Sequence, residues 1–244
     1  MSATAVELSR VTKRFLSPEP LTALDGVSLS AATGERLVVG GANGSGKSLL
    51  MAVIASLETP SSGSVRVQGR VGLVFQDADS QILGETPKED VAFGPSNLKL
   101  PKAEVKKRVT ELLRAVGLQE KAECPARSLS GGEKRRLAVA GVLAMDADII
   151  IFDEPYANLD YPGVRQVNAL VDQLHGAGKT LLILTHEIEK CLGFADHFVV
   201  LAQGKKVFDG TPAEALSQGR AQWERWGMRY PFVSYAKPED LIWR

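Results

Sequence analysis

The sequence predicts an α/β protein: a parallel sheet core, an antiparallel β layer ahead of it, and an α-helical subdomain inserted into it. Two observations indicate the core. Ile149–Phe152 and Thr180–Leu184 are uninterrupted apolar runs, as expected of strands buried on both faces of a parallel sheet. A third observation places the insertion, because helical patterns crowd between residues 80 and 145.

Length and charge exclude several classes of protein. A chain of 244 residues can bury a core without disulfides. Its 29 Lys and Arg balance 29 Asp and Glu, so no chain-wide basic field for nucleic acid is expected. Cys124 and Cys191 lie far apart without a CxxC partner, which argues against a zinc site or a disulfide framework.

The first part of the chain is expected to be extended. Three short runs, Ala5–Leu8, Ala23–Leu29 and Arg36–Val39, are separated by glycine and proline and predict an antiparallel start. A helix is then expected over Lys47–Leu57. Two further strands are expected around Gly63 and Gly69, over Ser64–Val67 and Val71–Phe75.

Capping signals mark the helices that follow. Thr86 can cap a helix that has Pro87 at its first position and Glu89 at its third. The apolar spacing over Lys102–Val116 predicts a second helix, which ends at Gly117. Ser130 can cap a third helix that runs to about Met145. After the strand at Ile149–Phe152, a crossover helix is expected over Val164–His175.

The sharpest motif is a glycine-rich loop between a predicted strand and a predicted helix. Residues 41–48 read GANGSGKS and fit the pattern GxxxxGK[ST]. Its backbone N–H groups and the helix N-terminus can cradle phosphates, Lys47 can reach the β and γ phosphates, and the Ser48 hydroxyl can ligate Mg²⁺. An ordinary glycine-rich turn is the alternative, which the flanking elements disfavour. The expected nucleotide contacts in this segment are Gly41, Asn43, Gly44, Ser45, Gly46, Lys47, Ser48 and Leu49.

Two carboxylates follow the apolar run Ile149–Phe152. Asp153 and Glu154 stand where that strand ends, which is the edge at which open α/β sheets bind ligands. Asp153 is expected to hold Mg²⁺, and Glu154 is expected to orient and activate an attacking water. Paired carboxylates are a weak signal alone, but they become a strong one beside a phosphate loop.

The order of the motifs carries a resemblance. Gln76, the segment Leu129–Glu133 (LSGGE), the segment 157–160 (ANLD) and Thr185-His186 stand around the two motifs above. This ordered set resembles the nucleotide-binding subunit of ABC transporters. The resemblance implies a P-loop NTPase with a RecA-like parallel sheet core that hydrolyses ATP with Mg²⁺. It implies one ATPase domain over residues 1–219, with the helical subdomain inserted at about 77–145.

The resemblance also implies roles for single residues. Phe15 would stack on adenine, although a plain core phenylalanine is the alternative. Gln76 would contact Mg²⁺ or the attacking water, and His186 would hydrogen-bond the γ-phosphate. Lys47 and Glu154 complete this catalytic set. In the family, two subunits pack head to tail, so a partner's signature segment and interface aspartate complete each site; here these are Ser130, Gly131, Gly132 and Asp160. A homodimer is favoured, with a heterodimer left open.

A narrower resemblance follows Gln76. Residues 75–82 (FQDADSQI) and 89–98 (EDVAFGPSNL) resemble the ATPase subunits of energy-coupling factor (ECF) importers for vitamins such as biotin, and for cobalt or nickel. This implies a membrane scaffold subunit docking near Gln76 and Gln81, and a separate substrate-binding membrane subunit. The chain itself shows neither a membrane-spanning run nor a signal peptide. It is therefore expected at the cytoplasmic face of the cell membrane, held there by partners.

Three alternatives stay open: an ATPase of another ABC importer or exporter class, a soluble ABC ATPase of DNA repair or translation, and a non-enzymatic nucleotide-binding module. The residues between Ser48 and Leu129 hold no sustained heptads for the coiled coil of repair types. No nucleic-acid partner is expected.

Two departures from the family are visible. Tyr156-Ala157-Asn158 replaces the small residues that the family usually has before Leu-Asp, at a segment of the expected dimer interface. Residues 220–244 form a tail that resembles nothing assignable and is rich in aromatic side chains. We expect it to pack on the core or on a dimer partner rather than to form a ligand site. Its aromatics are Trp223, Trp226, Tyr230, Phe232, Tyr235 and Trp243.

Overall fold

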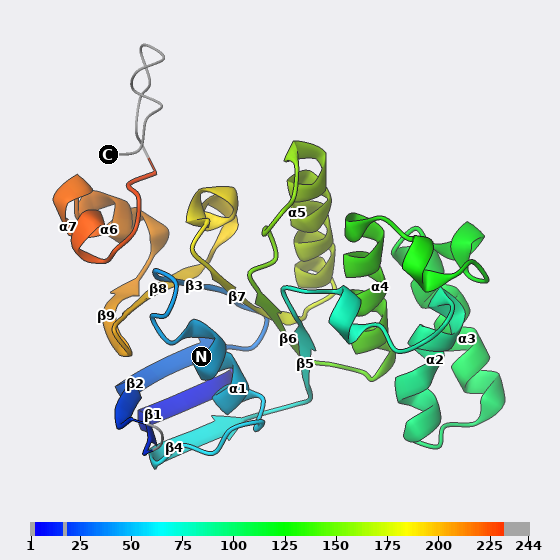
Figure 1. Ribbon diagram of the computed structural model, residues 1–244, viewed down its shortest axis with the longest axis horizontal. Helices are drawn as coiled ribbons and strands as arrows, with labels where there is room; N and C mark the ends of the chain where they lie inside the picture. The colour runs from blue at the N-terminus through cyan, green and yellow to red at the C-terminus, as the bar shows by residue number, and fades with distance from the viewer. Residues whose placement is uncertain (1–2, 17–18, 232–244) are drawn as a thin grey trace, which may run out of the picture.

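Two sheets and a group of helices make up the computed structural model, which describes residues 3–16 and 19–231 (Figure 1). The larger sheet has six strands in the order β5-β6-β7-β3-β8-β9, and its first five strands are parallel. The last, β9, runs antiparallel to β8. The strand bounds are Arg36–Gly40 for β3, Val71–Val74 for β5, Ile149–Asp153 for β6, Thr180–Thr185 for β7, His197–Ala202 for β8 and Lys205–Gly210 for β9.

The central strands are buried on both faces, which is why they read as continuous apolar runs. Alternate residues face opposite sides of a strand. Val38, Ile150 and Ile183 pack with the crossover helix α5 (Tyr161–Gly176), whereas Leu37 and Ile151 pack with α1 (Lys47–Ile54). The predicted parallel α/β core is therefore present.

The antiparallel layer is a three-stranded sheet in the order β2-β1-β4. Its strands are β1 (Thr4–Phe15), β2 (Leu21–Ala32) and β4 (Ser62–Val67), and its apolar face packs on α1. The expectation that Arg36–Val39 belongs to this layer is wrong. That run is β3, which pairs in parallel with β7 and β8 because its apolar residues need cover on both faces.

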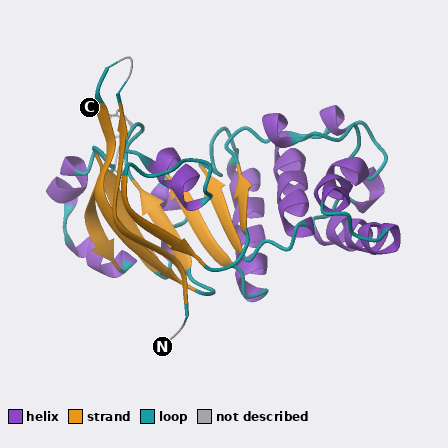
Figure 2. Cartoon of the chain, turned by 90° about the horizontal axis from the view of Figure 1, so that it is seen from below, coloured by secondary structure: helices purple, strands orange, loops and turns teal. Residues whose placement is uncertain are grey.

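The helical subdomain is built from α2 (Pro87–Asn97), α3 (Lys102–Ala115) and α4 (Gly131–Ala144). Figure 2 shows these helices at the end of the molecule away from the stacked sheets. Both predicted caps are present: the Thr86 side chain accepts from the N–H of Glu89, and Ser130 with Glu133 forms a capping box. Single turns of 3₁₀ helix occupy Asp79–Gln81, Gln119–Lys121, Ala126–Ser128, Ile188–Lys190 and Leu192–Phe194.

The chain after β9 folds back onto the larger sheet. Two short helices, α6 (Pro212–Ser217) and α7 (Arg220–Arg225), place Trp223 and Trp226 in the same core cluster as Phe198 of β8. The Trp223 ring stacks on the Phe198 ring with centroids 5.9 Å apart, and its Nε1 donates to the carbonyl of Ala215 at 3.0 Å. The sequence boundary expected at residue 220 thus coincides with the start of a helix in the core, while Phe232, Tyr235 and Trp243 lie outside the described residues.

Within the described part of the chain, none of the helices is both long and apolar enough to cross a membrane.

Candidate functional site

Parallel pairing brings the predicted motifs to one edge of the larger sheet. Gly40, the last residue of β3, is paired with Thr185 of β7, and Asp153 at the end of β6 is paired with Leu184. The phosphate loop, the two carboxylates and Thr185-His186 therefore leave the sheet side by side. Gln76 follows the neighbouring strand β5. This proximity follows from the positions of the motifs in the sequence, because the carboxyl ends of parallel strands lie at the same edge of a sheet.

The phosphate loop has a backbone that only glycine adopts without strain. Gly41 and Gly46 have φ values of +150° and +106°. A Cβ at Gly41 would overlap the carbonyl oxygen of Leu201, and one at Gly46 would lie 3.0 Å from the carbonyl oxygen of Ala23. The loop is therefore pressed against its surroundings on one side. A loop of this kind can turn its backbone N–H groups toward a phosphate.

Polar groups of the loop point to an anionic ligand. The buried Ser45 Oγ has no hydrogen-bond partner among the described residues. The Lys47 Nζ donates to the carbonyl oxygens of Gly41 at 2.8 Å and Ala42 at 3.2 Å, and the lysine is only 5% exposed. The first N–H groups of α1 lack intrahelical acceptors. The side chain of Leu49 packs against the core, so its main-chain N–H is what it offers to a phosphate.

The two expected metal ligands lie together. Ser48 Oγ donates to Asp153 Oδ1 at 3.4 Å. Burial is the largest influence on Asp153 and raises the pKa of its carboxyl group. A hydroxyl and a carboxylate side by side are oxygen donors of the kind that Mg²⁺ prefers, so these residues fit that ion.

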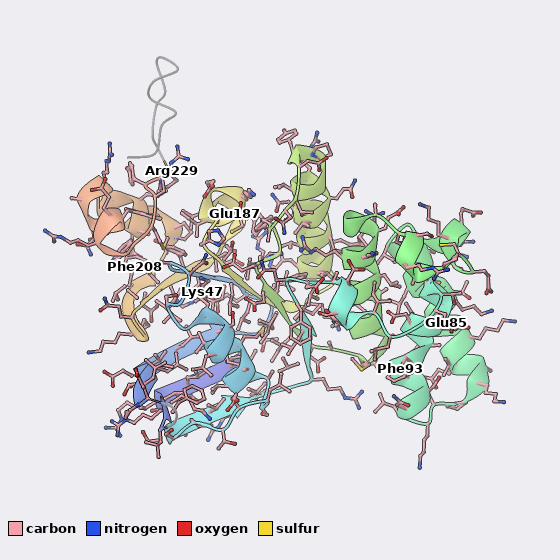
Figure 3. All side chains as sticks on the ribbon, viewed as in Figure 1. Lys47, Glu85, Phe93, Glu187, Phe208 and Arg229 are labelled. Carbon is pink, nitrogen blue, oxygen red and sulfur yellow. The ribbon has the colours of Figure 1, made fainter. Side chains whose placement is uncertain are left out.

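Glu154 is buried and lies at the centre of a network of polar groups, of which Lys47 and Thr185 are buried and His186 is exposed. Its Oε1 is 3.3 Å from Lys47 Nζ, and its Oε2 accepts from Thr185 Oγ1 at 3.0 Å and lies 2.9 Å from His186 Nδ1. The residue is 7% exposed and has a φ of +48°. Residues other than glycine rarely adopt this conformation, and those that do cluster at functional sites. Figure 3 shows Lys47 where α1 begins, near the middle of the molecule.

Two residues that are expected to contact the nucleotide or the metal, Gln76 and Phe15, are more exposed than Lys47 and Glu154. Gln76 is exposed, just beyond β5. Phe15 ends β1 and is 37% exposed, with the Lys13 Nζ 5.2 Å from its ring centroid. An exposed ring suits stacking better than it suits the alternative of a core phenylalanine.

The residues expected to act on a partner's nucleotide belong to other elements. Ser130, Gly131 and Gly132 begin α4, which lies with α2 and α3 away from α1 (Figure 1). Asp160 caps α5 and accepts from the N–H of Gly163 at 2.9 Å. The structure thus does not bring these four residues to the phosphate loop of their own chain. The unusual Tyr156 is fully buried, and its hydroxyl donates to Asn168 Oδ1 at 2.8 Å.

Sequence reasoning missed two polar residues of this region. The sequence places Thr185 in a motif but predicts no role for its hydroxyl, which donates to Glu154. Arg135 was not singled out, although it is buried and donates to the carbonyl oxygens of Gln76 and Pro155. The sequence signal for Arg135 is its spacing: it stands three residues before the buried Ala138, so the two lie on the same face of the helix.

An open groove of about 490 Å³ lies beside the turn that follows Gln76. It runs between that turn and the connection from α3 to α4. Its lining includes Asp79, Ile82, Gly84, Thr86, Pro125 and Arg127.

Comparison with known proteins agrees with this geometry. The family model described as "ABC transporter" matches residues 24–157. The energy-coupling factor transporter ATP-binding protein EcfA of Carboxydothermus hydrogenoformans is 40% identical over 242 residues, covering 94% of this chain and 88% of that protein. The cobalt import ATP-binding protein CbiO of Rhodobacter capsulatus is 39% identical over 234 residues, covering 90% and 83%.

Solved structures share the fold. CbiO1 from Clostridium perfringens, described as part of the ABC transporter complex cbiONQ, superposes with a TM-score of 0.80 at 29% identity, covering 93% of this chain and 98% of that one. A dimeric ATP-binding cassette in a post-hydrolysis state with ADP and Pi superposes with a TM-score of 0.75 at 28% identity, covering 85% and 98%. With its phosphate loop, its paired carboxylates and these relatives, the chain belongs to the ABC transporter family, as an ATP-binding protein of the energy-coupling factor type.

Proposed function

We propose that this chain hydrolyses ATP as a dimer and thereby drives an importer of the energy-coupling factor type. One observation carries the enzymatic part: the buried Lys47 and Glu154 form one network with the exposed His186, beside Ser48 and Asp153 at the carboxyl edge of the sheet. A module that only bound nucleotide would need the phosphate loop but not a carboxylate held between a lysine, a threonine and a histidine.

The network suggests how the residues would act. Lys47 would exchange the carbonyl oxygens of Gly41 and Ala42 for phosphate oxygens, a stronger pairing because the acceptor is charged. Its contact with Glu154 would then weaken, which leaves the carboxylate available to orient a water and accept its proton. The Nδ1 of His186 faces Glu154, so its Nε2 points away from Glu154 and is the atom we assign to the γ-phosphate.

Ser48 and Asp153, with Gln76, are the residues that we propose to hold Mg²⁺. When bound, the ion would neutralise charge on the β and γ phosphate oxygens. Phe15 would stack on the adenine ring with its exposed face. The remaining nucleotide contacts come from the backbone of residues 41–49.

A second copy of the chain would complete each site. Ser130, Gly131 and Gly132 stand at the N-terminus of a capped helix of fourteen residues, where N–H groups and the helix dipole favour an anion. We assign this segment to the γ-phosphate of the partner's nucleotide and Asp160 to the interface between the two sites. Because one chain carries the full set of catalytic residues, a homodimer is the simplest assembly.

The groove beside Gln76 is the surface that we propose for the membrane scaffold subunit. It begins at Asp79, in the same turn as Gln81, whose side chain donates to the carbonyl of Leu73 at 2.7 Å and so ties this turn to β5. A partner seated there would therefore sense the position of Gln76. Peripheral placement at the cytoplasmic face of the membrane follows from this docking. The cargo, a vitamin such as biotin or a cobalt or nickel ion, would be chosen by a separate membrane subunit.

The proposal predicts which proteins accompany the chain. The tagged full chain, purified from membranes of its native host, should be recovered with a polytopic scaffold protein and a small substrate-binding membrane protein. The material should hydrolyse ATP only with Mg²⁺, and Lys47→Ala should abolish the activity. Recovery with ribosomes or DNA in place of membrane proteins would contradict the transport role, in favour of a soluble ABC ATPase.

A further inference from the structure

Arg135 lies in the second turn of α4, buried among apolar residues. It is 5% exposed and shares one helix face with Ala138, Val139 and Val142, at spacings of three, four and seven residues. Taking a guanidinium out of water costs free energy unless its donors are satisfied. The hydrogen bonds of Arg135 must therefore offset the cost of burying its charge.

Those contacts are to two carbonyl oxygens of the backbone. Nη1 donates to the carbonyl of Pro155, and Nη2 donates to the carbonyl of Gln76 at 3.0 Å. Among the described residues no carboxylate pairs with Arg135, and its Nε has no partner. The guanidinium thus bridges two backbone segments while one of its donors, Nε, stays without a partner. Such a buried charge contributes little to stability, so its role is to hold the two segments in place.

The two carbonyls belong to segments that matter for hydrolysis. Gln76 is the residue that we assign to the metal and the water, and Pro155 directly follows Glu154. The neighbouring Lys134 pairs with the Asp79 carboxylate, so α4 also holds the far end of the turn after Gln76. The start of the same helix is the segment Ser130–Gly132.

From these contacts we infer that Arg135 is a positioning residue, whose guanidinium fixes the backbone of Gln76 and of Glu154-Pro155 relative to α4. This inference rests on the proposed function. Contact of Ser130–Gly132 with a partner's nucleotide would move α4, and Arg135 would pass that movement to both segments of its own site. Hydrolysis in one site would thereby be faster when the dimer also closes around the other.

The planar fork of an arginine is what reaches two acceptors at once. A lysine keeps the charge but offers a single ammonium on a flexible stem, so it cannot hold both carbonyls in this geometry. Arg135→Met removes every donor while filling similar space. Arg136 supplies a matched control, because it is the next residue of α4 but donates to Val116 and Gln166 and to neither of the carbonyls that Arg135 holds.

The test compares Arg135→Lys, Arg135→Met and Arg136→Lys in the purified full chain. We expect both Arg135 variants to lose kcat for Mg·ATP hydrolysis by about 10- to 100-fold, because small misplacements of catalytic groups are this costly. Their KM for ATP should stay within about threefold, since the phosphate loop is untouched. Arg136→Lys should keep the wild-type kcat, and thermal unfolding of Arg135→Lys should remain cooperative.

Two results would overturn the inference. One is a wild-type kcat in Arg135→Lys or Arg135→Met. The other is an unchanged kcat with the whole loss of kcat/KM in a raised KM, which would indicate weaker nucleotide binding. Glu154→Gln in the same assay separates this inference from the proposed function: if that variant also hydrolyses ATP at the wild-type rate, the assignment of the site itself is wrong.

Discussion

Lys47 and Glu154 satisfy each other's charge inside the protein. Both are buried, and the remaining hydrogen-bonding capacity of Glu154 is taken by Thr185 and His186. A buried charge that loses its partner is costly, by about 3–5 kcal/mol. The network therefore holds both side chains in place, and phosphate oxygens are the natural replacement partners for Lys47.

A second histidine cluster makes stability depend on pH. His197 opens β8, with Nδ1 at 3.2 Å from Glu35 and Nε2 at 2.6 Å from Asp209. The hydrogen bond with Glu35, followed by that with Asp209, raises the pKa of the imidazole, although burial opposes the shift. Lys206 also pairs with Asp209 and competes for it.

The sign follows from linkage. A pKa raised by folding stabilises the protein fully below the unfolded pKa of about 6.5, and this stabilisation is lost as pH rises through the folded pKa. The difference in unfolding free energy between wild type and His197→Gln should therefore be largest near pH 6 and shrink toward pH 9. Urea unfolding at several pH values measures this. A difference that stays constant over the range would contradict the role of His197, and His175→Gln controls for loss of a surface imidazole.

At the scale of elements, α4 joins the two parts of the molecule. Its residues Val139 and Val142 pack in the core of the larger sheet, whereas Leu137 and Ala140 pack in the core of the helical subdomain. A helix buried on both faces transmits displacement, because packed interiors deform little. Movement of the helical subdomain must therefore reach the edge of the sheet.

The C-terminal helices are the second element with a clear energetic role. Trp223 is fully buried and contacts the rings of Phe198, Trp226 and Tyr230. Trp223→Ala should lower the free energy of unfolding by about 3–5 kcal/mol through loss of apolar contact and the cavity left behind. Val207→Ala, at a residue that is 44% exposed, should change it by less than about 0.5 kcal/mol.

Chemical denaturation of both variants checks this prediction. Equal stability of Trp223→Ala and wild type would mean that α7 is not part of the folded core. The prediction matters for the limits of the domain, because a chain cut at residue 219 would lack Trp223, Trp226 and Met228, all members of the core cluster.

Elements with strong local signals were predictable from the sequence, and those with weak signals were not. The caps at Thr86 and Ser130 and the apolar runs at β6 and β7 carry their structure locally. In contrast, β8 and β9 were not predicted. The run that contains β8 carries no flanking motif. β9 lies at a sheet edge, and its exposed and partly buried residues alternate.

The site could be predicted as far as motif residues reach. The partners of Glu154 and of Arg135 depend on which strands pair and on a helix turn far along the chain, so they appear only in three dimensions. Tyr156 shows the same limit. It replaces a small residue, and only its burial and its bond to Asn168 reveal that it packs inward.

At the scale of the whole molecule, the proposed dimer can be tested by mixing variants. A Cβ at Gly131 meets nothing within 4 Å in this chain, so Gly131→Asp should fold and act only through repulsion of a partner's γ-phosphate. Lys47→Ala and Gly131→Asp chains should each be inactive alone. Their mixture should regain ATP hydrolysis, because mixed dimers contain one intact composite site.

The doubly substituted chain mixed with Lys47→Ala provides the control, since every site in that mixture lacks Lys47. It should stay inactive. Absence of recovery in the first mixture would contradict completion of the site by a second copy and would favour a different partner chain.

The most direct test of the account concerns Glu154, because the proposed chemistry depends on its carboxylate. Glu154→Gln keeps the shape of the side chain and removes its ability to accept a proton. With Mg·ATP, the full-length variant should form a stable dimer by size-exclusion chromatography and should hydrolyse ATP at least about 100-fold more slowly than wild type. Hydrolysis at the wild-type rate would contradict the assignment of Glu154 as the base and, with it, the proposed mechanism.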